Sequence, residues 1–448
     1  MRHSVQIPLT APAISHVHAT ELTAISEICD AEPRIARLVD QDLLRRCSKN
    51  GRTGRPGLTG DQVLRMAVAR QMNSWTYDEL TFHLADSLSY RTFCRVGFLE
   101  QAPSRATIAE NIGLLRQGTI AEINALLVTS DIGRQLDSGE TVRIDSTVVA
   151  SPIHPPSDSW LLFDCVRVLT QILKKAKCLS EFDCFHRHVK RAKRRHIEIQ
   201  HAKPQESAKR ETAYRDLLRV TEATVGYAAC ALEHMGSKRG SKAVRKVCLK
   251  LEATLDLTVR VIDQTRRRVL DGETVPAPEK VVSIFEPHTD VIVKDNRGTH
   301  YGHKIYLTGG KSGLILDCAI TKGNPSDSNW TVPMLRRHEM NYGAVPIQAS
   351  CDGSFASQEN LTKAKKLGVT DVCFSKRRGI EVSDMVRESW IYKKLRAFRA
   401  GIESVISWLK RSFGLKRCVW KSAKSFVTYV RLGVLTANLM ILARHRLA

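Results

Sequence analysis

The sequence changes character at TVRIDSTVVASPIHPPSDS, residues 141–159. Its first ten residues are rich in β-branched side chains, which favour an extended strand. The residues that follow include three prolines, and prolines at that spacing interrupt a helix. We therefore predict a strand that carries Asp145 and ends in a proline-rich loop.

The residues before this strand predict an all-helical domain over 51–137, preceded by an N-terminal segment over 1–50. Thr59 is placed to cap one helix, and Thr76 with Glu79 has the pattern of a capping box for the next. Apolar residues then recur at helical spacing. The arginines between these helices suit a helix lying in a DNA groove, but a small scaffold bundle would show the same pattern, so both interpretations stay open.

The residues after the loop return to a helical period over 161–280. Apolar side chains recur every seven positions from Cys248 to Val269, which predicts one long amphipathic helix packed against a partner near 207–235. Residues 186–250 contain 17 Lys and Arg against 6 Asp and Glu, so this helical block is a basic insertion. A DNA-gripping arm and a solvated face explain this charge equally well.

Strands return in the last part of the chain. HKIYLTGG (303–310) and GLILDCAIT (313–321) meet at glycines, as the two strands of a hairpin do. Further short strands then alternate with helices. This order predicts an α/β domain with a mixed sheet, formed by 138–160 and 281–448 and interrupted by the helical insertion.

The charge of the chain indicates an anionic partner. Its 448 residues include 69 Lys and Arg against 46 Asp and Glu, a formal charge of +23. Self-repulsion on that scale destabilises a compact fold unless an anion offsets it, and nucleic acid is the first partner to consider. The hydrophobic content of 43% is ordinary, which argues against a disordered or collagen-like chain.

Neither a secretory signal nor a membrane span is expected. The amino terminus lacks a sustained apolar core, and the apolar stretch 432–443 is interrupted by polar residues and is too short to cross a bilayer, so we predict a buried terminal helix. The 12 cysteines include no C-x-x-C pair, a pattern typical of reduced thiols in the cytoplasm. Cys178, Cys184, His186 and His188 have zinc-binding residue types, but their spacing favours packed Cys and solvated His.

Three carboxylates carry the candidate chemistry. Asp145 lies inside a strand, Asp352 lies at the carboxyl end of a later strand, where open α/β sheets place their ligands, and Glu403 lies on the last large helix. Arg399, Glu403 and Lys410 are separated by steps of four and seven and so share one helix face. The carboxylates could hold two Mg²⁺ ions for an in-line phosphoryl transfer, with the two cations beside them as phosphate contacts.

Each carboxylate also has an ordinary explanation. Asp145 could face solvent from an alternating strand, Asp352 could form a turn, and Glu403 could belong to a helix salt bridge. Taken singly, these explanations are favoured over catalysis. Asp317 is a competing carboxylate, but it falls in the middle of a hairpin strand, and no loop follows it where a substrate could approach.

The order of four motifs decides between these interpretations. They are IDSTVV around Asp145, Y-G-H-K at 301–304, D-G-S-F-A-S from Asp352, and R-x3-E-x6-K at 399–410. With them the chain resembles a DDE transposase of bacterial insertion sequences, over about 138–160 and 281–445. The helical unit at 51–116 is similar to the N-terminal domain of that family.

The resemblance implies a ribonuclease-H-like fold for the α/β domain. It also implies that Asp145, Asp352 and Glu403 form a metal-binding triad for two Mg²⁺ ions, with Mn²⁺ able to substitute. Arg399 and Lys410 match the basic positions that the family carries around its Glu.

Two further positions bear on DNA contacts. Lys304, in the Y-G-H-K motif, is a candidate DNA-binding residue. The family often has an aromatic residue three positions before the Arg, but Arg396 stands there in this chain. That departure puts base stacking by an aromatic side chain in doubt and leaves the metal site unaffected.

The resulting expectation is an insertion-sequence transposase in the bacterial cytoplasm, associated with the nucleoid. It would bind its terminal inverted repeats in double-stranded DNA, hydrolyse a strand at each end with Mg²⁺, and join the 3′-hydroxyl to target DNA. Both ends must be held together, so we expect a homodimer in the synaptic complex. The alternatives are a ribonuclease-H-like nuclease that does not join strands and a non-catalytic DNA-binding protein derived from a transposase.

Overall fold

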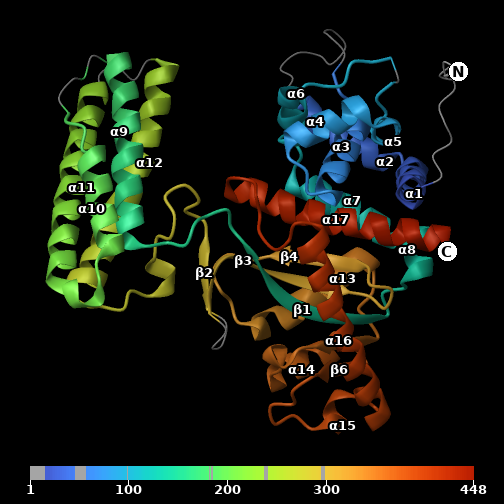
Figure 1. Cartoon of the computed structure of the whole chain (residues 1–448). Helices are drawn as coiled ribbons and strands as arrows, with labels where there is room; N and C mark the ends of the chain where they lie inside the picture. Colours follow the sequence, from blue (N-terminus) through green and yellow to red (C-terminus); the bar gives the residue numbers. More distant parts are fainter. Residues whose placement is uncertain are drawn as a thin grey trace, which may run out of the picture. The chain divides into compact units, whose positions relative to one another are not determined.

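The computed structural model divides the chain into two compact units (Figure 1). The residues that it describes are 16–45, 57–97, 99–180, 182, 185–236, 241–293 and 298–448. Unit 1 comprises Met1–Val149, Lys304–Thr321 and Pro325–Ala448, and unit 2 comprises Ala150–His303 and Lys322–Asn324. Residues 51–56, at the start of the expected helical domain, and Cys184, in the Cys and His cluster, lie outside the described residues.

Helices precede the first strand throughout the described part of unit 1. They are α1 (Val17–Ala31), α2 (Arg34–Leu44), α3 (Gly60–Met72), α4 (Tyr77–Asp86), α5 (Leu88–Phe93), α6 (Arg105–Ile112), α7 (Gln117–Thr129) and α8 (Asp131–Leu136). The predicted caps are confirmed, because Thr59 and Thr76 both form complete capping boxes at the starts of α3 and α4. Helices α1 and α2 fall in the expected N-terminal segment, and α2 packs against α3 and α7.

The C-terminal helix α17 (Ala423–Leu447) packs against α1, α3 and α7. It is long and apolar enough to pass a test for a membrane span, but 83% of its apolar window is buried inside the protein. The predicted buried terminal helix is therefore confirmed, and the packing of the core accounts for its apolar sequence.

A mixed sheet of six strands lies in the described part of the chain. The strands are β1 (Thr141–Ala150), β2 (Asp290–Val293), β3 (Thr299–Gly309), β4 (Ile315–Ile320), β5 (Gln348–Cys351) and β6 (Asp371–Phe374). The order is β2-β3-β1-β5-β6, and β4 also pairs with β3. Strands β1, β5 and β6 are parallel, whereas β2 and β4 run antiparallel to β3, so the predicted mixed sheet and the predicted β3–β4 hairpin are both confirmed.

The remaining helices of unit 1 lie in its C-terminal half. They are α13 (Thr331–Tyr342), α14 (Gln358–Lys366), α15 (Val382–Met385) and α16 (Ser389–Ser412), with short helical turns at Asp327–Trp330 and Gly353–Phe355. Helix α16 packs against β5 and β6, and α13 packs against β4 and α14.

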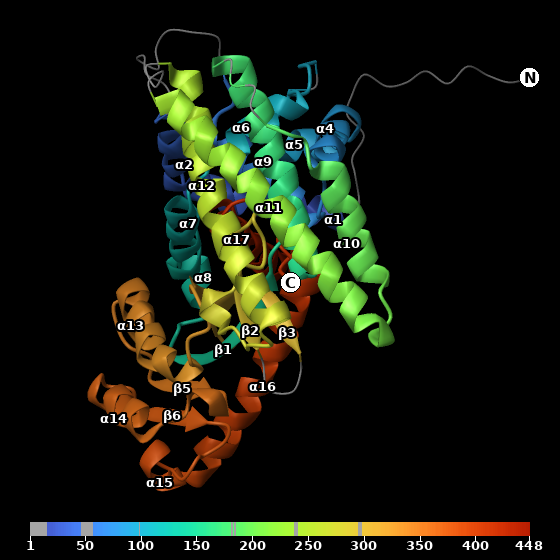
Figure 2. The same ribbon diagram turned by 90° about the vertical axis from the view of Figure 1, so that its left-hand side faces the viewer.

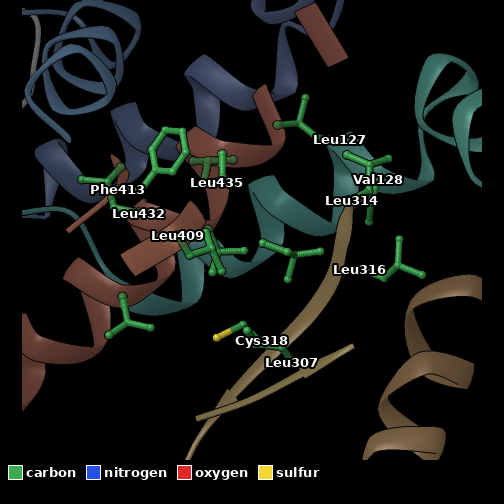
Figure 3. Close-up of a cluster of buried hydrophobic side chains, with 14 of the residues drawn as sticks. Leu127, Val128, Leu307, Leu314, Leu316, Cys318, Leu409, Phe413, Leu432 and Leu435 are labelled. Atoms are coloured by element: carbon green, nitrogen blue, oxygen red, sulfur yellow. The ribbon is translucent and has the colours of Figure 1, made fainter. Parts of the chain in front are cut away.

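One hydrophobic core connects the sheet of unit 1 to its helices. Figure 3 shows Leu314 beside Val128 of α7, and Leu432 and Leu435 of α17 in the same cluster. The N-terminal helices, the sheet and the C-terminal helix therefore share one core.

Four long helices dominate unit 2, and they run side by side (Figure 2). They are α9 (Asp158–Ser180), α10 (Val189–His201), α11 (Ser207–Gly236) and α12 (Lys242–Thr265), with short helical turns at Pro204–Glu206, Arg266–Leu270 and Ala277–Glu279. The predicted amphipathic helix is α12, which buries Cys248 and Ile262 against α9 and α11. It ends before Val269, which lies in the following π-helical turn.

The Cys and His cluster of the insertion differs from expectation in one respect. Cys178 is exposed and not packed, because it lies near the end of α9 on the outer face of the bundle. His188 stacks on Tyr227 with ring centroids 5.9 Å apart.

Candidate active site

The pairing of β1 with β5 brings two of the predicted carboxylates together. The strands are parallel, and Ile144 is in register with Cys351. Asp145, inside β1, and Asp352, directly after the end of β5, each follow a residue of that pair, so they lie at neighbouring positions. This is the edge of the sheet at which β5 ends, and open α/β sheets place their ligands at the carboxyl ends of strands.

Helix α16 is fixed against this edge by a buried arginine of β1. Arg143 Nη1 donates a hydrogen bond to the carbonyl oxygen of Phe398 at 3.0 Å, and its guanidinium lies 4.8 Å from the centre of the Phe398 ring. A Cβ on Gly401 would lie only 2.1 Å from Arg143 Nη1, so glycine is required for this close approach. Ser350 Oγ donates a second hydrogen bond to α16, at the carbonyl oxygen of Leu395.

Arg399 joins the three predicted carboxylates. Its Nη2 lies 3.0 Å from Asp145 Oδ2 and 3.6 Å from Asp352 Oδ1. Its Nη1 lies 3.0 Å from Glu403 Oε1. The Asp145 side chain is 13% exposed and the Glu403 side chain is 65% exposed, so the cluster runs from the buried strand to the surface. We call Asp145, Asp352 and Glu403 with Arg399 the carboxylate cluster.

The two aspartates of the cluster differ in their electrostatic environment. Burial raises the pKa of Asp145, although Arg399 opposes the shift. Burial also acts to raise the pKa of Asp352, but a hydrogen bond from Ser375 Oγ at 2.8 Å and the nearby charge of Arg399 leave that pKa below its usual value. Asp145 therefore depends most on a neighbouring cation to remain ionised.

The chemistry of the cluster fits a divalent cation. Carboxylate oxygens are the ligands that Mg²⁺ prefers, and three of them already share one positive group. As the side chains stand, no group of three or more His, Cys, Asp or Glu in the described chain is arranged to hold a metal. The Arg399 guanidinium contacts all three of these carboxylates in the structure.

Two families of known proteins match the chain. The family described as Transposase DDE domain matches residues 263–439, which include Asp352, Arg399 and Glu403. The family described as Transposase domain (DUF772) matches residues 21–113. The chain belongs to the DDE-type transposases. Neither the curated proteins nor the solved structures gave a match.

The two matched regions of the transposase leave Asp145 outside. Its place in the site rests on the strand pairing and on the contact with Arg399. The match to residues 21–113 covers α2 and most of α1, which accords with their packing in the same core as α3.

Lys304 and Lys410 are the other predicted DNA contacts of the transposase. Lys304 is 7% exposed, and its Nζ donates to the carbonyl oxygen of Pro325 at 2.9 Å and lies 3.2 Å from Asp327 Oδ1. Lys410 is half-buried in the last turn of α16. Contact between Lys304 and DNA would require its ion pair to open.

Asp317, the competing carboxylate, has a structural partner. Its two oxygens accept hydrogen bonds from Arg337 at 2.5 and 2.7 Å, which ties β4 to α13. None of its hydrogen bonds or ion pairs in the described chain involves the carboxylate cluster. The pairing with Arg337 gives Asp317 a structural role between β4 and α13.

Sequence reasoning missed Arg143 and Gly401. A signal for the first was present, because residues two apart on a strand point to the same face, and Arg143 precedes Asp145 by two. No local signal marks Gly401, since a glycine inside a helix has no pattern that reveals which side chain crosses it.

Proposed function

We propose that this transposase belongs to a bacterial insertion sequence, cleaves DNA strands at the ends of its element and joins the freed 3′-hydroxyls to target DNA. The observation that carries the proposal is the convergence of Asp145, Asp352 and Glu403 on Arg399 from β1, β5 and α16. Asp145 is buried, and the nearby charge of Asp352 acts to raise its pKa, which Arg399 opposes. Buried carboxylates held close together in this way are common at functional sites.

We assign the triad to two Mg²⁺ ions, for which Mn²⁺ can substitute. When bound, the ions supply nucleophile activation and charge stabilisation at the reacting phosphate. Arg399, released from the carboxylates, remains beside them and pairs with a phosphate oxygen, as a planar guanidinium does well. Lys410 adds a second positive group from the same helix, and Lys304 adds a third where its ion pair with Asp327 opens.

We further propose that the mixed sheet with α13, α14 and α16 is a ribonuclease-H-like catalytic domain. A five-strand path with β1 between antiparallel β3 and parallel β5 supports this assignment. Helices α3–α8 form the domain that reads the element ends. The charge of +23 supports double-stranded DNA as the partner, and the need to hold two ends supports a homodimer in the active complex.

Helix α10 is the strongest candidate for a DNA-gripping surface in unit 2. It buries Ala192, His196 and Ile199 against the bundle, while Lys193 and Arg194 are exposed. Neither of these two cations forms an ion pair in the described chain, whereas Arg195 next to them is paired with Asp216 at 2.6 Å. Unpaired cations on an outer face are available to phosphates.

A cleavage and joining assay tests the proposal. The substrate is DNA that carries the sequences flanking the gene, incubated with the full chain and Mg²⁺ and with an unlabelled target plasmid. We expect strand cuts at inverted repeats and covalent transfer of the labelled 3′ end to the plasmid. Cutting without transfer would favour the nuclease alternative, and no cutting with either Mg²⁺ or Mn²⁺ would favour the non-catalytic alternative.

A further inference from the structure

A cavity of about 630 Å³ lies in unit 1 between the N-terminal helices and the start of α17. The residues that matter for its chemistry are Arg70, Trp75, Tyr77, Arg105, Trp420 and Lys424. None of them belongs to the carboxylate cluster. The volume lies within the usual range for small-molecule sites, roughly 300 to 1,000 Å³.

Arg70 is a buried charge without an anionic partner. Its side chain is 8% exposed in the last turn of α3. The guanidinium lies 4.2 Å from the centre of the Tyr77 ring and 5.4 Å from that of Trp420. In the described chain it forms no ion pair, and its Nε has no hydrogen-bond partner. A buried charge is costly unless it is paired, and the two rings offset only part of that cost, so an anion from outside the chain would stabilise Arg70 further.

A second arginine on the same helix shows that the fold can provide carboxylates for a buried guanidinium. Arg65 is 1% exposed, and it pairs with Asp61 at 2.7 Å and with Asp30 at 2.8 Å. Arg65 contacts two carboxylates, whereas Arg70, five residues further along α3, contacts two aromatic rings. The contrast indicates that the environment of Arg70 is suited to an external anion.

The walls of the cavity suit a flat ring next to that anion. Trp75, Tyr77 and Trp420 are half-buried around it, and Trp75 is held in place by stacking on His83 with ring centroids 4.0 Å apart. Trp420 Nε1 is a second buried donor with no hydrogen-bond partner in the described chain. Bases stack on aromatic side chains and phosphates pair with guanidinium groups, so this combination matches a nucleotide.

The rim of the cavity favours a nucleotide that is part of a strand. Lys421 and Lys424 are exposed beside Trp420, whereas the exposed Arg105 is paired with Asp78 at 3.0 Å. These cations lie outside the cavity, so they can bind phosphates only if the ligand is a nucleic-acid strand that extends beyond the cavity.

We propose that this cavity takes one unpaired nucleotide of a DNA strand, with its base between the aromatic walls and its phosphate near Arg70. The choice of DNA as the source of the nucleotide rests on the proposed function. The assignment of a nucleotide to the cavity rests on the unpaired Arg70 guanidinium and the aromatic walls, and it does not depend on the proposed function. The cavity therefore adds a second DNA contact to the transposase, which reads the absence of base pairing and not a base sequence.

Binding of 2-aminopurine probes to the full chain tests this proposal. One duplex carries a single extrahelical 2-aminopurine, and a second carries the same base paired with thymine. A metal chelator is present throughout, so strand cleavage cannot affect the result. The binding test therefore gives an answer even if the catalytic proposal is wrong. We expect the extrahelical probe to bind about tenfold more tightly than the paired probe, with a change in its fluorescence on binding.

Two pocket variants and one matched control complete the experiment. Arg70→Gln and Trp420→Leu should each remove the preference for the extrahelical probe while the paired probe binds as before. Trp390→Phe, an exposed tryptophan on α16 outside the cavity, should leave the preference unchanged. Because Arg70 is buried, thermal melting is recorded for each variant, and the exposed Lys424→Ala provides a variant that does not disturb the core.

Three results would overturn the proposal. The first is equal affinity of the parent chain for the two probes. The second is a folded Arg70→Gln protein that keeps the full preference. The third is displacement of the extrahelical probe by free deoxyadenosine monophosphate at the same concentration as by the extrahelical duplex itself. That result would make a free nucleotide the ligand.

Discussion

Replacing Gly401 with alanine is expected to impair catalysis while leaving the rest of the protein intact. The new Cβ would lie 2.1 Å from Arg143 Nη1 and 3.1 Å from its Cζ. The guanidinium is restrained, because it is 6% exposed and donates to the carbonyl oxygen of Phe398. Either Arg143 gives up its hydrogen bond to Phe398 and turns aside, or helix α16 moves outward by about 1 Å to reach ordinary contact distance; we expect the helix to move.

The expected magnitude follows from that displacement. Arg399 and Glu403 flank position 401 on the same helix, so they move away from Asp145 with it. A misplacement of about 1 Å in a catalytic group costs roughly 100-fold in rate, or about 2.7 kcal/mol. The free energy of unfolding should change less than the activation free energy. Alanine is more favourable than glycine inside a helix by about 1 kcal/mol, which offsets part of an overpacking cost of about 1–3 kcal/mol.

The assay compares strand cleavage, duplex binding and urea unfolding for Gly401→Ala and for Gly226→Ala. Gly226 lies inside α11 with nothing within 4 Å of an added Cβ, so that variant carries the same change in helix propensity without a clash. We expect Gly226→Ala to keep full activity and Gly401→Ala to lose about 100-fold in cleavage with duplex binding retained.

A double variant identifies the cause of the loss. If Gly401→Ala acts through Arg143, then adding it to Arg143→Leu should cost little more, because the clash no longer exists. Wild-type cleavage by Gly401→Ala, or full additivity of the two changes, would refute the account of how α16 is positioned.

Three further predictions follow from the site and the charge. Amide replacement of any triad carboxylate should reduce cleavage by ~100-fold or more while gel-shift binding survives, because binding rests on the basic surface. Asp317→Asn should cleave normally, but its free energy of unfolding in urea should fall by about 1–3 kcal/mol, because Arg337 loses its charged partner. Loss of cleavage in that folded variant would mean that the active site is elsewhere. If about six phosphates are neutralised, duplex affinity should fall roughly a thousandfold between 50 and 200 mM salt, and Lys193→Ala with Arg194→Ala should lower the log–log slope by about 2; a flat salt profile would remove the DNA role of unit 2.

Features set by neighbouring residues were predictable from the sequence. The capping boxes at Thr59 and Thr76 need only four residues each, and the β3–β4 hairpin needs only its glycines and alternation. The prediction that Asp145 and Asp352 belong together came from motif order, and the register of β1 with β5 places them side by side.

Features that depend on distant side chains were not predictable in the same way. The sequence placed Arg399 as a phosphate contact, but its position between three carboxylates depends on where α16 docks. That docking is set by Arg143 and Gly401, which are 258 residues apart in the chain. The packing of α1 and α2 in the main core was likewise hidden, because an amphipathic helix does not reveal which surface covers it.

The position of α17 has a consequence for the synthesis of the protein. This helix leaves the ribosome long after α1, α3 and α7, and it fills the core between them. The N-terminal helices cannot complete their apolar packing until α17 has been synthesised. A nascent transposase therefore exposes this apolar surface, so that its early helices are open to chaperones and proteases until the 25 residues of α17 dock.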